Sequence, residues 1–293
     1  MKASKSPLRK TSFISTGMAP LDSIMGGGVP MRRITQFSGA PGTGKTTTAY
    51  MCASEAQKRG LKVYWYDTEK RFDFDFAEAL GINLSQLELE THDHAEDIFQ
   101  SMVDKAEEDD VFLVLDSVGG LHTRKEASSL DVGYPDAPKL IPVFIRHLVV
   151  PLSMHNSAAL LLNHEKITFD GKLKVLGGEA IPFHSTNWVR FRRTTKKIMQ
   201  GEKEIATGIE AKMWKGKFFH QTCELIQKYT GGFDMELMLA DNAIEAGVIV
   251  KEKTSYYLDG EKLCTGLGNL RDMFTDKDFA AKIQERLNGT SGT

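Results

Sequence analysis

The stretch of sequence that decides the fold lies at residues 39–46 and reads Gly39-Ala40-Pro41-Gly42-Thr43-Gly44-Lys45-Thr46. In the pattern G-x-x-x-x-G-K-T, glycines let consecutive backbone N–H groups curl around a phosphate. Lys45 would reach the β- and γ-phosphates, and the Thr46 hydroxyl would ligate Mg²⁺. Residues 33–38 before the loop read as a strand, and Thr47–Lys58 after it read as a helix whose positive end faces the phosphates. Strand, loop and helix in this order predict a nucleoside triphosphate site that extends to Thr47.

The overall composition is that of an ordinary globular protein. Of the 293 residues, 41% are hydrophobic and 26% are charged, and the net charge of −2 gives no general attraction to nucleic acid. The longest apolar runs have the length of buried strands and are too short to cross a membrane. Three well-separated cysteines show no metal-binding spacing. We therefore expect a cytoplasmic protein with no membrane partner, whose contacts with nucleic acid come from local patches.

The order of the segments predicts an α/β fold. From residue 14 onward strands and helices alternate, which is typical of a mostly parallel sheet with helices on both faces. The further strands of this sheet are expected at residues 61–66, 111–115, 158–163, 189–193 and 208–214. Shorter runs that predict a small β region near the C-terminus lie at residues 225–229, 248–251 and 256–258. We expect a short basic N-terminal arm at residues 1–13, a core at residues 14–260 and a short C-terminal helical tail at residues 261–293.

Two acids stand at the ends of expected strands. Asp116 follows the apolar run 111–115, and the carboxyl end of such a strand lies beside the phosphate loop, where an acid holds Mg²⁺ partly through water. Glu69 ends a strand that we expect next to the loop strand, where a carboxylate can polarise the water that attacks the γ-phosphate. The alternatives are a strand-terminal cap for Asp116 and a solvated helix-cap acid for Glu69.

Together with further motifs, these residues make the chain resemble the RecA family of ATP-dependent DNA recombinases, including its phage-encoded members. The residues before the phosphate loop, Ile14–Gly17 and Gly26–Pro30, look like the family's lead-in. Asp67-Thr68-Glu69 is similar to the turn that carries the family's catalytic glutamate. The resemblance covers about residues 14–258 and implies a RecA-like P-loop ATPase and DNA-binding core with ATP and Mg²⁺ as cofactors. The short N-terminal arm and the short C-terminal region depart from the family's pattern.

The resemblance implies roles for further residues of the nucleotide site. Asp73 and Phe76 fall where the family contacts adenine, and Asp116-Ser117 looks like its Mg²⁺-linked strand end. His164 occupies the place of the polar residue that senses the γ-phosphate and relays its presence to a DNA-binding loop. Tyr229 resembles an aromatic residue near the nucleotide.

Other positions resemble the family's contacts with a neighbouring subunit and with DNA. Lys215 and Lys217 look like the lysines that one subunit offers to the next subunit's γ-phosphate, and Phe183 like the aromatic residue that crosses the subunit boundary. The two DNA loops would be residues 123–136 and 164–178, and a plain solvated connection is the alternative for each. The residues expected to contact DNA are Arg124, Lys125, Lys166, Phe169, Lys172, Lys174, Gly177 and Gly178.

Both DNA loops also contain acids, so the positive charge per subunit is weak. Weak charge suffices when many subunits line one strand, because counterion release adds along a filament. A basic run further along the chain is interpreted as a solvated hairpin in preference to a site for a second DNA strand. It consists of Arg190, Arg192, Arg193, Lys196 and Lys197.

The leading functional hypothesis is a DNA-dependent ATPase that forms a helical filament on single-stranded DNA and pairs it with homologous double-stranded DNA, in recombination and repair. Mediator and single-strand-binding proteins are further expected partners. The compact chain suggests phage origin, so the location would be the nucleoid or the host cytoplasm. One alternative is a RecA paralogue that binds ATP and DNA as a mediator without strand exchange. A second alternative is a ring-forming helicase-type ATPase. Such motors use an arginine finger, whereas the candidate residues for this role here are lysines.

Overall fold

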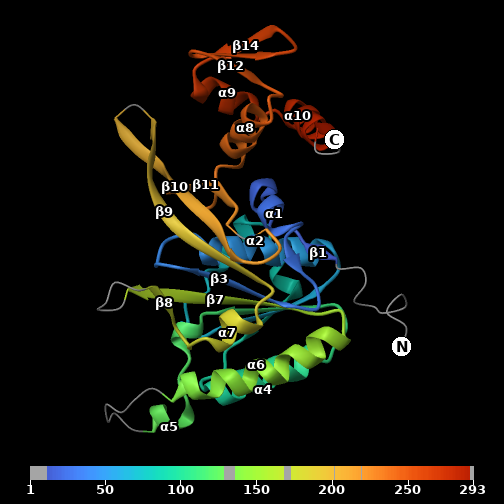
Figure 1. The fold of residues 1–293 in the computed structure, drawn as a ribbon, viewed down its shortest axis with the longest axis vertical. Coiled ribbons are helices and arrows are strands. Elements are labelled where there is room, and N and C mark those ends of the chain that lie inside the picture. Colours follow the sequence, from blue (N-terminus) through green and yellow to red (C-terminus); the bar gives the residue numbers. More distant parts are fainter. Residues whose placement is uncertain (1–11, 129–135, 168–172, 201, 219, 291–293) are drawn as a thin grey trace. The chain divides into compact units, whose positions relative to one another are not determined.

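A computed structural model describes residues 12–128, 136–167, 173–200, 202–218 and 220–290 (Figure 1). The chain divides into two compact units. Unit 1 comprises Met1–Thr194 and Ile209–Glu224, and unit 2 comprises Thr195–Gly208 and Leu225–Thr293. Most of the expected N-terminal arm and the expected DNA contacts Phe169 and Lys172 lie outside the described residues.

The main sheet consists of nine strands among the described residues. Their bounds are β3 (Ile34–Gly39), β4 (Lys62–Asp67), β5 (Leu87–Glu90), β6 (Val111–Asp116), β7 (Ala158–Ile167), β8 (Leu173–Val175), β9 (Asn187–Gln200), β10 (Lys203–Lys215) and β11 (Thr222–Lys228). The strand order is β11-β10-β9-β3-β7-β6-β4-β5, with β8 paired to β7. A separate pair is formed by β1 (Phe13–Ile14) and β2 (Val29–Pro30). Since β3 pairs in parallel with β7 and β9, and β6 with β4 and β7, the predicted α/β fold with a mostly parallel sheet is confirmed.

Helices cover both faces of this sheet in unit 1. The helices of unit 1 are α1 (Ala19–Met25), α2 (Lys45–Lys58), α3 (Phe74–Ala79), α4 (Ala95–Ala106), α5 (Arg124–Ala127), α6 (Ala137–Met154) and α7 (Ala180–His184). Figure 1 shows α2 on one side of the strands and α4 and α6 on the other. On the α2 side, Tyr50 stacks on Trp65 of β4, with ring centroids 4.6 Å apart. On the other side, Phe99 of α4 stacks on Phe144 of α6 at 4.0 Å.

Helix α6 is long and apolar enough to span a membrane by length and composition alone. Its side chains Phe144, Ile145 and Leu148 are buried in the core between the sheet and α4. Burial of these side chains accounts for the apolar residues on one face of this helix, whereas Val143, Val150 and Met154 are exposed.

The position of β4 differs from the expectation. We expected the strand before Glu69 next to the loop strand β3, and this is wrong, because β6 and β7 lie between β4 and β3. The carboxyl ends of parallel strands nevertheless meet at one edge of a sheet. The parallel register that pairs Asp67 with Asp116 therefore still brings the residues after β4 to the edge that carries the phosphate loop.

Unit 2 contains a packed core near the C-terminus. Helix α8 (Met235–Glu245) is followed by an antiparallel sheet of β12 (Val250–Glu252), β13 (Ser255–Leu258) and β14 (Glu261–Thr265), and then by α9 (Leu267–Met273) and α10 (Lys277–Thr290). The core of this unit joins Ala240, Tyr256, Leu270 and Ile283. Within residues 261–290, the described part of the expected helical tail, β14, α9 and α10 belong to unit 2. Of residues 225–229, expected in the small β region, residues 225–228 belong instead to β11 of the main sheet.

Candidate nucleotide-binding site

The phosphate loop connects β3 to α2 and uses backbone conformations that favour glycine. Gly42 and Gly44 have φ angles of 72° and 81°, in the left-handed region that glycine enters without steric cost. The Nζ of Lys45 donates hydrogen bonds to the carbonyl oxygens of Gly39 and Ala40 at 3.0 and 2.9 Å. Burial lowers the pKa of Lys45, while nearby carboxylates oppose this shift. A buried ammonium held at the base of the loop is suited to an anionic ligand.

Thr46 and Asp116, the two expected Mg²⁺ residues, lie together. The Thr46 Oγ1 donates a hydrogen bond to Asp116 Oδ2 at 3.0 Å. Burial raises the pKa of Asp116 to about 7, and the hydrogen bond from Thr46 acts in the opposite direction. A hydroxyl and a carboxylate are oxygen ligands of the kind Mg²⁺ prefers, and a divalent cation would stabilise the charged form of this buried acid. The donor set therefore fits Mg²⁺.

Glu69, which lies two residues beyond β4, meets the end of β6 and the middle of β7. Its Oε1 accepts a hydrogen bond from Ser117 Oγ at 2.7 Å and lies 2.9 Å from Nε2 of His164. Burial alone raises the pKa of Glu69, but the hydrogen bonds from His164 and Ser117 outweigh it, so the pKa is lower than usual. Glu69 is therefore ionised at neutral pH, as a residue that polarises water must be.

Thr68 fixes the relative position of these two strand ends. Its Oγ1 donates to the carbonyl oxygen of Ser117 at 2.7 Å and accepts from the Ser117 N–H at 2.9 Å. Thr68 and Ser117 are both buried. These two hydrogen bonds hold the turn that contains Glu69 against Ser117, which itself donates a hydrogen bond to Glu69.

A cleft of about 460 Å³ opens beside this group of side chains. Its lining includes Pro41 of the phosphate loop together with Glu69, His164, Glu165 and Lys166. The cleft therefore connects the phosphate loop with the strand that leads into the expected second DNA loop.

The expected adenine residues lie beside α2. Asp73 caps α3, and its side chain accepts a hydrogen bond from the Phe76 N–H at 3.0 Å. The Asp73 N–H donates to the hydroxyl of Tyr50, and the Phe76 ring lies 6.0 Å from the Tyr50 ring. Tyr229, expected near the nucleotide, belongs to unit 2, where its hydroxyl donates to Glu204.

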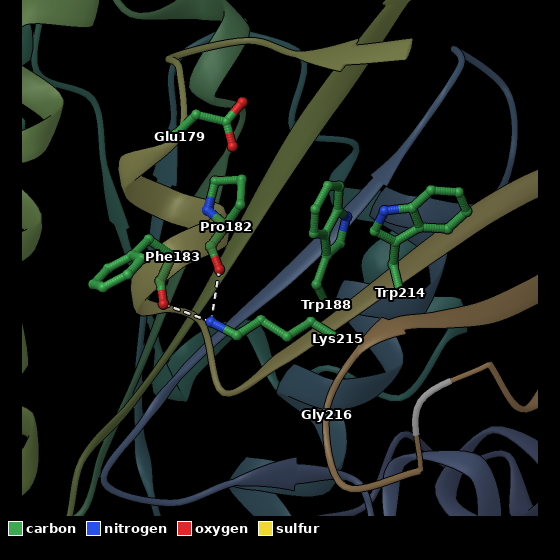
Figure 2. A pocket seen from close by; sticks show the side chains of 7 residues that line it. All are labelled: Glu179, Pro182, Phe183, Trp188, Trp214, Lys215 and Gly216. Atoms are coloured by element: carbon green, nitrogen blue, oxygen red, sulfur yellow. Dashed lines mark hydrogen bonds between the residues drawn. The ribbon is translucent and has the colours of Figure 1, made fainter. Parts of the chain in front are cut away.

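The two lysines expected to act on a neighbouring subunit lie at a second pocket or next to it. The Nζ of Lys215 donates to the carbonyl oxygen of Pro182 at 2.9 Å and to that of Phe183 (Figure 2). Lys215 lines a pocket of about 490 Å³ together with Phe183, Trp188 and Trp214. Burial lowers the pKa of Lys215. The Phe183 side chain is 75% exposed, and Lys217, also exposed, lies with its Nζ 5.3 Å from the Phe218 ring.

The cations of the expected first DNA loop are paired with acids in this structure. Arg124 contacts Asp97, and Lys125 lies 2.8 Å from Asp136. These are exposed pairs, which contribute little to stability and exchange readily for other anions.

The second loop begins as a hairpin of β7 and β8. Lys166 and Lys174 are opposite each other in the register of this hairpin, and both are exposed. Two like charges in this arrangement repel, so an anion between them would be favourable. Gly177 and Gly178 follow with φ angles of 79° and 75°, and a Cβ on Gly177 would lie 2.6 Å from Ile141 Cδ1.

One basic side chain lies in surroundings that the sequence did not indicate. Arg190 was expected in a solvated hairpin, and this is wrong, because its guanidinium pairs with the buried carboxylate of Glu165 at 2.9 Å. Its neighbours two and three residues on are exposed: Arg192 pairs with Glu210, and Arg193 donates to the carbonyl oxygen of Gly42 at 3.0 Å. The sequence predicted a strand at residues 189–193, but no pattern in it indicated Glu165 as the partner of Arg190.

Comparison with known proteins agrees with this arrangement. The family described as the RecA N-terminal domain matches residues 1–232. Protein RecA of Staphylococcus carnosus (strain TM300) is 28% identical over 304 residues, covering 98% of this chain and 85% of that protein. Protein RecA of Staphylococcus aureus (strain JH9) is 28% identical, with coverage of 97% and 86%, and that of Desulforapulum autotrophicum is 26% identical, with coverage of 100% and 88%. Because the matched residues include the phosphate loop, the turn with Glu69 and the strand with Lys215, the chain belongs to the RecA family.

Proposed function

We propose that the chain is an ATP-dependent DNA recombinase of the cytoplasm, which forms filaments on single-stranded DNA and promotes homologous pairing and strand exchange in recombination and repair. The observation that carries this proposal is the contact of Glu69 with both Ser117 and His164 at the edge of the phosphate-loop cleft. In a member of the RecA family, this contact joins a candidate hydrolytic carboxylate to the strand that leads into a candidate DNA loop.

ATP would be held by the phosphate loop with its terminal phosphates toward Lys45. Thr46 and Asp116 would hold Mg²⁺, which, when bound, neutralises charge on the phosphate oxygens. Asp73 and Phe76 are the candidates for contact with adenine. In this arrangement Glu69 accepts a hydrogen bond from the attacking water, and hydrolysis yields ADP and phosphate.

His164 supplies the link to DNA. Its Nε2 shares Glu69 Oε1 with Ser117, and the hairpin with Lys166 and Lys174 begins at the next residue, Glu165. A change in the hydrogen bonds of Glu69 during turnover therefore acts directly on the base of the candidate DNA loop. ATP and ADP would favour different conformations of this loop, and thus different affinities for DNA.

Lys215 and Lys217 are the candidates for the contact between subunits. Neither is among the residues that line the cleft beside Glu69, which supports a role toward the nucleotide of a neighbouring subunit. Lys215 now donates to two backbone carbonyls, and a phosphate of the neighbour would be a stronger acceptor because it is charged. Loss of the γ-phosphate removes that acceptor and weakens the junction.

The test combines ATP hydrolysis with a strand-exchange assay on homologous oligonucleotides. We expect hydrolysis that single-stranded DNA stimulates, and transfer of a labelled strand from duplex to product in the presence of ATP and Mg²⁺. Lys45→Ala should abolish both because nucleotide binding is lost. DNA-stimulated hydrolysis without any strand transfer would favour a mediator paralogue, and hydrolysis indifferent to DNA would contradict the proposal.

A further inference from the structure

Four side chains of β3, β7 and β9 form one connected set, which we call the Glu165 network. The Ser38 and Glu165 side chains are buried, and Trp188 and Arg190 are partly buried. The Glu165 carboxylate accepts a hydrogen bond from Ser38 Oγ at 2.8 Å and from Arg190 Nε at 2.9 Å. Ser38 Oγ in turn accepts from Trp188 Nε1 at 2.7 Å. The Glu165 side chain is only 6% exposed, so its charge depends on these partners rather than on water.

The Glu165 network reaches the nucleotide site at one end. Ser38 directly precedes Gly39, the first residue of the phosphate loop. Glu165 lines the cleft that also contains Glu69 and His164. Burial lowers the pKa of Lys45, and the charge of Glu165 is one of those that oppose this shift. An anion that enters the cleft therefore acts on Glu165 as well as on Lys45.

The other end of the Glu165 network reaches the pocket of Lys215. Trp188 lines that pocket together with Trp214, which directly precedes Lys215 (Figure 2). The guanidinium carbon of Arg190 lies 5.2 Å from the centre of the Trp214 ring, within the range of a cation–π contact. The Glu165 network thus reaches the cleft at the phosphate loop through Glu165 and the pocket of Lys215 through Trp188.

Charge explains why Arg190 matters to the nucleotide site. An unneutralised carboxylate beside the phosphate loop would repel a triphosphate more than a diphosphate, because the additional phosphate carries further negative charge. Arg190 neutralises Glu165, and removal of one partner from a buried ion pair leaves the other without compensation. Removal of both the Arg190 charge and the Glu165 charge leaves no uncompensated carboxylate beside the phosphate loop.

We propose that Arg190 and Glu165 are positioning residues that tie the phosphate loop to the Lys215 pocket, so that nucleotide binding is transmitted to the face offered to a neighbouring subunit. The inference rests on the proposed function and extends it. Ser38 and Trp188 form one arm of this connection, and Arg190 and Trp214 form the other.

The first experiment measures the dissociation constants of ADP and of a non-hydrolysable ATP analogue by calorimetry on the full chain. Arg190→Gln should weaken binding of the analogue by about tenfold, a typical size for coupling between sites, and that of ADP by less. The double variant Glu165→Gln, Arg190→Gln should recover binding of the analogue. Lys62→Gln, which breaks an exposed pair with Glu108, is the control and should bind as the wild type does. Unchanged binding by Arg190→Gln, or no recovery in the double variant, would overturn the inference.

The second experiment follows tryptophan emission and stays decisive if Arg190→Gln does not fold. Trp188 and Trp214 are two of the three tryptophans of the chain. The analogue should change the emission of the wild type. This change should be smaller in Trp188→Phe, which keeps Trp214, and absent in Glu165→Gln, although the latter still binds the analogue. An equal change of tryptophan emission in the wild type and in Glu165→Gln would refute the coupling but not the proposed function. A wild-type chain that binds no nucleotide would refute both the coupling and the proposed function.

Discussion

Three carboxylates near the phosphate loop differ in the charge state that their surroundings favour. Hydrogen bonds keep the pKa of Glu69 below its usual value despite burial, while burial raises that of Asp116 to about 7. Glu165 is compensated by Arg190. The residue poised to polarise water is thus ionised, and the residue poised to hold Mg²⁺ becomes fully ionised when a cation is present.

Glu69→Gln should bind ATP but hydrolyse it at least about 100-fold more slowly, a typical loss when a general base is removed. An amide retains the size and the contact with Ser117, but it cannot accept a proton from water. Nucleotide affinity measured by calorimetry should stay within about threefold of the wild type, in contrast to Lys45→Ala. Normal turnover by Glu69→Gln would show that this residue does not activate the water.

Asp116 should make stability depend on pH. Its pKa in the folded chain, about 7, lies above the ordinary value of 3.8, so between these values the folded state holds a proton that the unfolded state has lost. Stability therefore falls as the pH rises toward 7. Without nucleotide or Mg²⁺, the wild type should lose about 2 kcal/mol relative to Asp116→Asn between about pH 5.5 and about pH 8. Urea unfolding at both pH values measures this difference, and parallel pH curves for the two proteins would contradict it.

At the scale of elements, the pair of helices α4 and α6 closes one face of the sheet. Phe99 and Phe144 stack almost face to face, with an angle of 8° between their planes. Phe144→Ala should lower the free energy of unfolding by about 3–5 kcal/mol, the usual cost of removing a buried aromatic ring. Val143→Ala on the exposed side of the same helix should change it by less than about 0.5 kcal/mol. Chemical denaturation of both variants provides the test, and similar losses would mean that the ring stack does not support the helix pair.

The elements also show what local sequence patterns can reveal. The run Val111–Leu115 and the loop at residues 39–46 predicted a strand and a strand–loop–helix unit, because burial on both faces and a phosphate loop leave local patterns. Strand order depends on contacts between distant segments, and the wrong placement of β4 next to β3 reflects this. Arg190 was misread for the same reason, since its partner Glu165 is 25 residues away in the sequence.

At the C-terminus, the pattern of the elements predicted a helix but not the unit to which it belongs. Residues 277–290 form α10 as the sequence suggested, yet Ile283 packs in a core with Tyr256 and Leu270. Short strands of three to five residues carry little periodicity, so β12, β13 and β14 gave a weak signal.

For the whole molecule, Lys215 tests whether ATP is shared between subunits. Lys215→Ala should bind ATP within about threefold of the wild type, because a single subunit supplies the phosphate loop. DNA-stimulated hydrolysis should fall by at least about tenfold, because the neighbouring phosphate loses a cationic partner. Rates measured on mixtures with Glu69→Gln should then show whether one subunit complements the other. Full activity of Lys215→Ala would argue against a role at the junction.

The most direct test of nucleotide-controlled assembly is electron microscopy of the purified chain with single-stranded DNA, Mg²⁺ and a non-hydrolysable ATP analogue. Bound analogue should stabilise the junction through Lys215 and the DNA loop through His164, so we expect open helical filaments that are lost when ADP replaces the analogue. Lys45→Ala, unable to hold the analogue, should form none. Closed rings, or particles that remain single subunits with DNA and analogue present, would contradict a filament built by ATP at the junction between subunits.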